Sequence, residues 1–141
     1  MPKVQEMVLY YQAVEEKDEQ KERQKEKEKN VRLMKSVLVR MGVRIKNIGP
    51  KQVLEQVGWL AGVEGFSASE MTGQEELPVI LQDVLVMKNF TSERIDRLLA
   101  ELRKAGVPKI ALKAIVTPQN VSWSFYTLYQ ELIREHEAIK E

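Results

Sequence analysis

Short apolar runs alternate with amphipathic segments along this chain, and that alternation constrains the fold more than any other feature. Residues 7–11 and 84–87 are continuous apolar runs. Runs of this length and character are typical of strands that are covered on both faces. Each is followed along the chain by an amphipathic helical pattern and then by a second strand pattern. This repeated order predicts an α/β fold with a mostly parallel sheet and flanking helices.

The hydrophobic periodicity predicts four strands and four helices. We expect strands at 7–11, 43–48, 84–87 and 110–116, and helices at 31–41, 52–57, 92–105 and 121–139. The second strand mostly alternates apolar and polar residues, which fits an edge strand with one wet face. We therefore expect a single α/β domain over residues 1–141, with strand order 2-1-3-4 and two βαβα halves.

A charged run from Glu15 to Asn30 interrupts the first half. It contains seven acidic and six basic residues and no apolar residue. A segment with nothing to bury favours a solvated, helical extension of the first helix. An arm that binds a partner is the alternative interpretation.

The two predicted halves share local detail. Met41-Gly42-Val43 ends the first helix, and Ala105-Gly106-Val107 ends the third. The strands that follow read apolar-Lys-x-Ile, at 45–48 and at 112–115, and each leads to a proline that begins a turn. Duplication of one ancestral half explains this likeness, and a chance likeness between short strand–turn–helix units is the alternative.

Composition excludes several classes of function. The net charge of +1 argues against a nucleic-acid binder that acts through a basic surface. With no cysteine and a single histidine, His136, we expect no disulfide, thiol nucleophile or metal site, and no cofactor. No apolar run approaches the roughly 20 residues of a membrane helix, and the first residues lack the apolar centre of a signal peptide. We expect a soluble, cytoplasmic protein.

Ligands of parallel α/β sheets bind beyond the carboxyl ends of the strands. Six residues at or near those ends are candidates for ligand binding, and none is assigned a catalytic role: Tyr11, Asn47, Lys113, Thr117, Asn120 and Trp123. Lys113 lies in an otherwise apolar strand, where desolvation lowers an amine pKa, as a nucleophile or base requires. The alternative is that it reaches from the sheet edge into water. Capping of the last helix explains Thr117 and Asn120 without any ligand.

Two classes of function remain, and the first is favoured because the sequence contains no nucleophile–base or metal-binding constellation. The first is a binding or regulatory module without catalytic activity, which acts through a protein partner or self-association. The second is a domain for a small or anionic ligand, with enzymatic activity left open, at the strand ends and the N-terminus of the last helix. Convergence of Tyr11, Lys113, Thr117 and Asn120 on one cleft favours the second class. Their use in packing and capping favours the first.

The segment from Lys113 carries Lys-Ala-Ile-Val-Thr-Pro-x-Asn-x-x-Trp-x-Phe-x-x-Leu and runs on to Glu135-His136. This pattern resembles the C-terminal signature of the bacterial domain-of-unknown-function family 3783. The resemblance extends back through Gly42-Val43-Arg44-Ile45-Lys46 and Trp59-Leu60-Ala61-Gly62-x-x-Gly65-Phe66. It implies a soluble bacterial domain in which the turn at 117–123 matters, and it implies no substrate and no catalytic residues.

Overall fold

The computed structural model describes residues 5–13, 21–68 and 76–139. Within these ranges the elements are β1 (Met7–Tyr11), α1 (Lys21–Arg40), β2 (Arg44–Ile48), the 3-10 helix η2 (Pro50–Gln52), α2 (Val57–Leu60), β3 (Val84–Lys88), α3 (Ser92–Lys104), β4 (Leu112–Ile115), the 3-10 helix η3 (Asn120–Ser122) and α4 (Phe125–Ile139). Several boundaries differ from the expected ones. The strand expected at 110–116 spans only Leu112–Ile115, and two helices also differ clearly. The helix expected at 52–57 is replaced by η2 and α2, and the last helix begins at Phe125 because η3 precedes it.

The four strands form one sheet in the order β2-β1-β3-β4, which confirms the predicted order. β1 pairs with β2 and β3 pairs with β4 in parallel, whereas the central strands β1 and β3 are antiparallel. The sheet is therefore mostly parallel, and each half is a parallel βαβ unit. Because the central strands β1 and β3 are antiparallel, β1 and β2 finish at one end of the sheet, measured along the strands. β3 and β4 finish at the opposite end.

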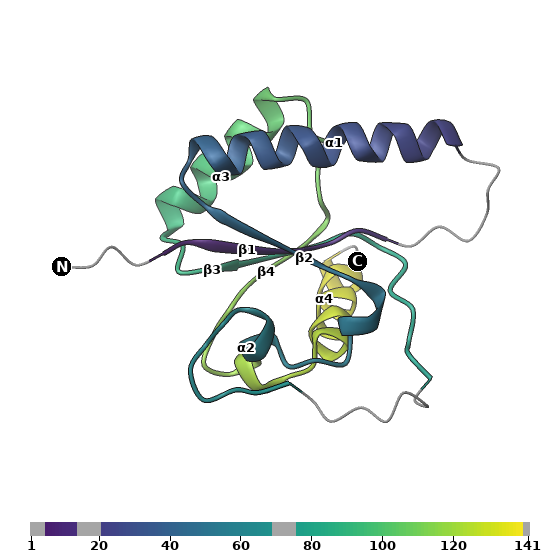
Figure 1. Cartoon of the computed structure of the whole chain (residues 1–141), viewed down its shortest axis with the longest axis vertical. Coiled ribbons are helices and arrows are strands. Elements are labelled where there is room, and N and C mark those ends of the chain that lie inside the picture. The colour runs from purple at the N-terminus through teal and green to yellow at the C-terminus, as the bar shows by residue number, and fades with distance from the viewer. Residues whose placement is uncertain (1–4, 14–20, 69–75, 140–141) are drawn as a thin grey trace.

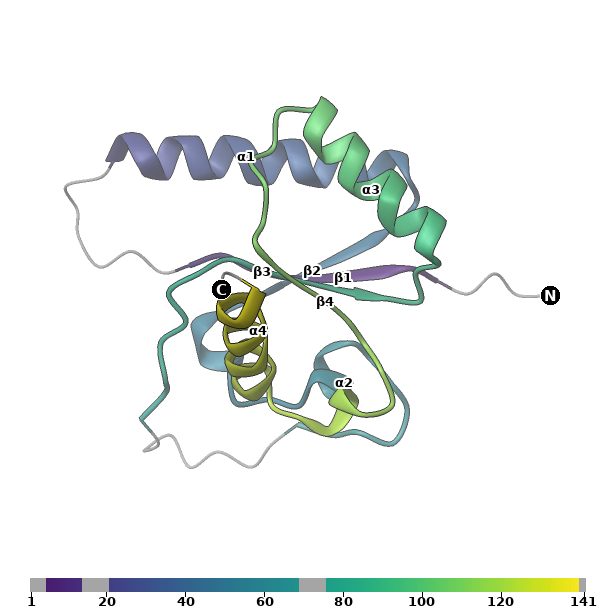
Figure 2. The same ribbon diagram turned by 180° about the vertical axis from the view of Figure 1, so that it is seen from behind.

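Helices cover both faces of the sheet, and each face carries one helix from each half (Figure 1). α1 and α3 lie together on one face, and α2 and α4 lie on the other, as the reverse view also shows (Figure 2). A right-handed crossover places its helix on a face that depends on the strand direction and on the side to which the unit extends. Both are reversed between the halves, so α1 and α3 share a face and contact each other.

Burial along the strands follows these two faces. Val84 to Met87 are all buried, as expected of a central strand covered on both sides. In β2, Arg44 and Asn47 are exposed, which agrees with its predicted edge position. β4 forms the opposite edge, and Ile115 near its end is 43% exposed.

The charged run is only partly described. α1 begins at Lys21, and the side chains of Lys25, Glu26, Glu28 and Lys29 are exposed. Its apolar stripe begins further along, with Met34, Val37 and Leu38 buried beneath the helix. Residues 14–20 lie outside the described residues, so the solvated extension and the partner-binding arm both stay predictions.

The two halves end their first helices alike. Gly42 and Gly106 have φ of +73° and +89°, the left-handed conformation of a glycine just beyond a helix. The next amide in each case reaches back to a carbonyl five residues earlier, from Val43 N to Leu38 O and from Val107 N to Leu102 O, both at 2.9 Å. The likeness between the halves therefore extends to the hydrogen bonds that end these helices.

The likeness does not continue into the strands. β2 begins two residues after Gly42, whereas β4 begins six residues after Gly106. The apolar-Lys-x-Ile runs also differ in orientation, because Lys46 pairs with Leu9 and Lys113 pairs with Leu85. Leu9 belongs to the core beneath α2 and α4, and Leu85 to the core beneath α1 and α3. The two lysines therefore point to opposite faces of the sheet. Lys46 pairs with the third residue of β1, whereas Lys113 pairs with the second residue of β3, so the two runs differ in register by one residue.

Candidate functional site

The six candidate residues do not form one site. Tyr11 and Asn47 lie at the end of the sheet where β1 and β2 finish. Thr117 follows β4, which finishes at the opposite end of the sheet. Asn47 is exposed on an outer strand, where it pairs with Tyr10. The prediction that the carboxyl ends of all four strands meet at one end of the sheet is wrong. It assumed that β1 and β3 run in the same direction, whereas they are antiparallel.

Tyr11 is a core residue. It is fully buried, its hydroxyl donates to the Ile80 carbonyl at 3.2 Å, and its ring centroid lies 6.0 Å from that of Phe125. Burial raises the pKa of its hydroxyl above the ordinary tyrosine value. The hydroxyl is therefore engaged with the backbone, and Tyr11 is not among the lining residues of the two cavities described below.

Thr117 and Asn120 cap one another. The Thr117 amide donates to Asn120 Oδ1 at 2.9 Å, and the Asn120 amide donates to Thr117 Oγ1 at 3.1 Å. Asn120 Nδ2 also donates to the Ile115 carbonyl at 2.9 Å, which ties the turn to the end of β4. Asn120 is buried although Thr117 is exposed, so these bonds satisfy the polar side chain of Asn120 inside the protein.

The N-terminus of α4 offers its first three amides to the protein itself. Phe125 N donates to Glu55 O at 2.9 Å, Tyr126 N to Val53 O at 2.8 Å and Thr127 N to Ser124 Oγ at 3.1 Å. The anion site considered as the alternative at this helix start therefore lacks free donors among these amides. Trp123 contributes its carbonyl to Val57 N at 2.8 Å, and its partly buried ring packs against the core beneath α4.

Lys113 differs from the other candidates. Its strand neighbour Leu85 is 1% exposed, so the lysine side chain leaves β4 on a strongly apolar face. Lys113 Nζ donates to the Ile110 carbonyl at 2.5 Å. Burial lowers the pKa of this amine below its ordinary value, and the nearby charge of Lys109 lowers it further.

Lys113 lines a cavity of about 450 Å³ between α3, β4 and the loop that joins them, which we call the Lys113 cavity. Its aliphatic lining consists of Leu85, Leu99, Leu102, Val107, Pro108 and Ile110. Arg103, Lys109 and Lys113 add three cationic side chains, and no acidic residue is among the described lining residues. Arg103 and Lys109 are exposed, so they mark the solvent side of the cavity.

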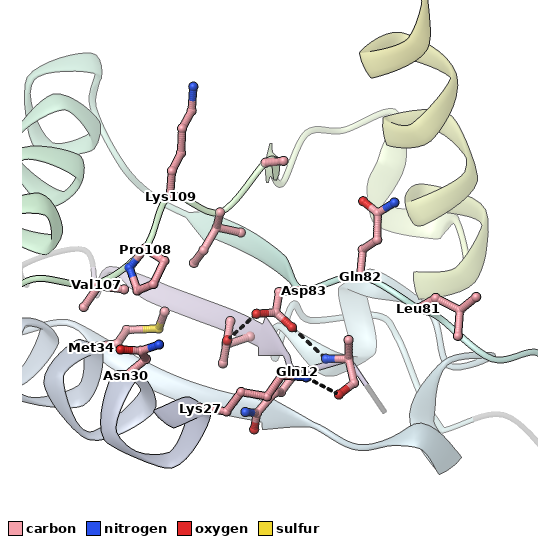
Figure 3. Close-up of a pocket in the computed structure, with 14 residues that line it drawn as sticks. Gln12, Lys27, Asn30, Met34, Leu81, Gln82, Asp83, Val107, Pro108 and Lys109 are labelled. Atoms are coloured by element: carbon pink, nitrogen blue, oxygen red, sulfur yellow. Dashed lines mark hydrogen bonds between the residues drawn. The ribbon is translucent and has the colours of Figure 1, made fainter. Parts of the chain in front are cut away.

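A second cavity, of about 320 Å³, lies on the other side of the same loop, toward α1 and the end of β1 (Figure 3). We call it the Asp83 cavity. Asp83 Oδ2 accepts from the Tyr10 hydroxyl at 3.1 Å, and Oδ1 accepts from the Ala13 amide at 2.7 Å. Lys27 Nζ donates to the Ala13 carbonyl at 3.5 Å, and Lys109 points away from Asp83. The bonds to Asp83 tie the exit of β1 to the entry of β3, which is a structural role.

Both cavities depend on the loop between α3 and β4. Val107, Pro108, Lys109 and Ile110 line each of them. The first half has no counterpart to this loop, because β2 follows almost directly after Gly42. The different spacing from glycine to strand is visible in the sequence and was the signal that sequence reasoning missed.

The comparisons with known proteins concern the second half of the chain. Residues 83–139 match the family model described as a domain of unknown function (DUF3783). This segment is therefore similar to the DUF3783 family. It runs from the residue before β3 into α4 and contains every residue that lines the Lys113 cavity. The Asp83 cavity instead draws several lining residues from β1, α1 and the segment between them, outside the matched segment.

The resemblance predicted for the C-terminal segment is therefore confirmed. The DUF3783 match does not include residues 42–46 or 59–66, to which the resemblance was extended. No curated protein and no solved structure matches the chain. Within the described ranges, no helix is long and apolar enough to span a membrane.

Proposed function

We propose that the protein is a non-catalytic binding module whose Lys113 cavity holds a small molecule with an apolar body and an anionic group. The observation that carries this proposal is the composition of the lining. Six aliphatic side chains face three cationic ones without an acidic residue among them. An anion that enters the cavity gains attraction from all three cations, and no acidic lining residue repels it.

The state of Lys113 supports the same proposal. Among the described residues, Lys113 has no carboxylate within ion-pair distance, and burial disfavours its ammonium form, as the lowered pKa indicates. A ligand carboxylate placed beside Lys113 supplies the missing partner. Its gain in free energy is larger here than at an exposed lysine, because the surroundings are less polar than water.

The apolar part of the ligand has a matching surface. Leu85 and Leu102 are buried at the base of α3 and the sheet, and Leu99 is half-buried beside them. Removal of apolar area from water contributes about 25 cal/mol per Å². A cavity of about 450 Å³ lies within the size range of small-molecule sites.

Octanoate, octanamide and octylamine test this proposal, since they share an apolar chain and differ in charge. We expect octanoate to raise the melting temperature, octanamide to act weakly and octylamine to have no effect. The variant Lys113→Met should lose most of the octanoate effect. Lys104→Met is the matched control, because Lys104 is exposed on α3 and does not line the cavity. Equal effects of the three compounds would overturn the proposal.

Self-association is a second candidate, and a separate observation favours it. Val79 and Leu81, in the segment that precedes β3, are 52% and 63% exposed. Neighbouring exposed apolar side chains are typical of surfaces that contact another chain. Sedimentation equilibrium of wild type and Leu81→Gln tests whether a second copy covers them. We expect a dimer that the substitution weakens, and a monomer at all concentrations would exclude this candidate.

A further inference from the structure

We infer that Lys113 captures an aldehyde group of the ligand as a covalent imine. The inference rests on the proposed function, and it narrows the ligand to an apolar aldehyde that also carries an anionic group. The imine forms without catalysis of a further reaction, so the protein acts as a covalent binding module. Three features of the Lys113 cavity support it.

The first feature is the position of the amine. Lys113 lies on β4 and lines the cavity, opposite the buried Leu85. The Ile110 carbonyl accepts a hydrogen bond from Nζ at 2.5 Å, which orients the amine within the cavity. A nucleophile held on a strand by a backbone contact loses less conformational freedom on reaction than a lysine on a mobile side chain.

The second feature is the absence of an acidic partner among the described lining residues. Elsewhere in the described chain, Lys104 has such a partner, because its Nζ lies 3.7 Å from the Glu101 carboxylate. For Lys113, burial disfavours the charged ammonium form, and the nearby charge of Lys109 disfavours it further. At a given pH, a larger share of the Lys113 amine is therefore neutral than in an ordinary exposed lysine. The neutral amine is the form that attacks a carbonyl carbon.

The third feature is the placement of the other two cations. Arg103 and Lys109 are exposed lining residues, whereas Lys113 is half-buried. In a ligand that carries both groups, the anionic group pairs with Arg103 or Lys109 instead of with Lys113. The rest of the ligand then lies toward the aliphatic lining and Lys113. This arrangement brings an aldehyde at the other end of the ligand to the amine.

The chemical step needs no further reagent. The Nζ lone pair forms a bond to the aldehyde carbon, and one N–H proton passes to the carbonyl oxygen to give a carbinolamine. The hydroxyl group then leaves with the second N–H proton as water, and the C=N double bond forms. Carbon keeps its oxidation level throughout, and the products are one imine and one water molecule.

Three related probes test the inference on the full chain. 4-Formylbenzoate carries an aldehyde and an anion, 4-methylbenzoate keeps the anion without the aldehyde, and benzaldehyde keeps the aldehyde without the anion. The protein is incubated with each compound and sodium cyanoborohydride, which reduces an imine to a stable amine. Peptide mapping by mass spectrometry then locates the adducts. Binding of 4-methylbenzoate is measured separately by calorimetry.

We expect 4-formylbenzoate to label Lys113 at least tenfold faster than Lys104, and benzaldehyde to label Lys113 several-fold more slowly than 4-formylbenzoate does. Lys113→Met should abolish the selective adduct. Labelling spread over exposed lysines would overturn the inference. If 4-methylbenzoate still binds in that case, the non-covalent function stands alone. If it does not bind either, the proposed function fails as well.

Discussion

Lys113 lies opposite Leu85 in the parallel pair of β3 and β4, so a charged side chain projects from the same sheet face as a fully buried leucine. This placement separates Lys113 from the first-half lysine that resembles it in sequence, Lys46, which projects from the other face. It also places the amine against the loop between α3 and β4.

Replacement of Lys113 by methionine should stabilise the protein at neutral pH. The pKa of Lys113 is lower in the folded state than in the unfolded state. The unfolded chain therefore binds this proton more tightly, and the amine opposes folding below the window between the two pKa values. That opposition fades as pH rises toward the unfolded value of about 10.4.

Urea unfolding of wild type and Lys113→Met at several pH values between 7 and 10 checks this prediction. We expect the advantage of the variant to be small, because the amine is only partly buried, and to shrink as pH rises. A variant that is less stable than wild type at pH 7 would show that the hydrogen bond to Ile110 outweighs desolvation.

Tyr10 should make the protein less stable at high pH. Burial raises the pKa of its hydroxyl, and the charge and hydrogen bond of Asp83 raise it further. The folded state keeps this proton after the unfolded state begins to lose it near pH 10, so the unfolding free energy falls above that pH. The slope for one such group is about 1.4 kcal/mol per pH unit.

The variant Tyr10→Phe should show a shallower fall of stability above pH 10, with the remainder due to Tyr11, whose pKa is also raised. Loss of the bond to Asp83 should cost about 1 kcal/mol at pH 7. Unfolding curves at pH 7, 9 and 10.5 measure both effects. Identical pH dependence in wild type and variant would contradict this account.

Gly58→Ala should destabilise the layer that α2 forms beneath the sheet. A Cβ at this position would lie 2.7 Å from the Phe66 ring and 2.8 Å from Val121 Cγ2, and Gly58 is buried. We expect a loss of about 1–3 kcal/mol in unfolding free energy, the usual cost of overpacking. Gly49→Ala is the control, since its nearest contact is Gln52 Oε1 at 3.7 Å and its φ is an ordinary −88°. Equal stability of the two variants would contradict the close packing at Gly58.

Arg94 joins three segments of the chain. Its guanidinium donates to both carboxylate oxygens of Glu6, at 2.6 to 3.1 Å, and to the Met41 carbonyl at 2.8 Å. Lysine cannot reproduce this planar arrangement, so Arg94→Lys should cost about 1 kcal/mol, and less at high salt. Arg134→Lys should change nothing measurable, because its partner Glu131 lies on the same exposed helix face. Denaturant curves at low and high salt compare the two variants.

The sequence predicts the strand order because burial patterns distinguish the strands. The polar alternation of β2 marks an edge, and the continuous apolar run of β3 marks the centre. Burial patterns do not show whether β3 runs parallel or antiparallel to β1. The connection from β2 to β3 is long enough to allow either direction. The antiparallel central pair, and the separation of Tyr11 from Thr117 that follows from it, therefore could not be predicted.

The candidate site was predictable only in part. Lys113 stands out in the sequence as a charge within an apolar strand, and the capping roles of Thr117 and Asn120 follow from their positions in the turn. The residues that surround Lys113 were not predictable. Leu99 and Leu102 reach it through the packing of α3 on the sheet, which no local pattern specifies.

Binding of an anion in the Lys113 cavity can be located directly by NMR. Octanoate is titrated into ¹⁵N-labelled full-length protein, and amide chemical shifts are followed. We predict saturable changes, with a dissociation constant of roughly 1 mM or tighter, in the amides of Leu99, Leu102, Lys109 and Lys113. Changes confined to residues 117–127 at the start of α4, or no changes at millimolar octanoate, would contradict the assignment of the Lys113 cavity as the binding site.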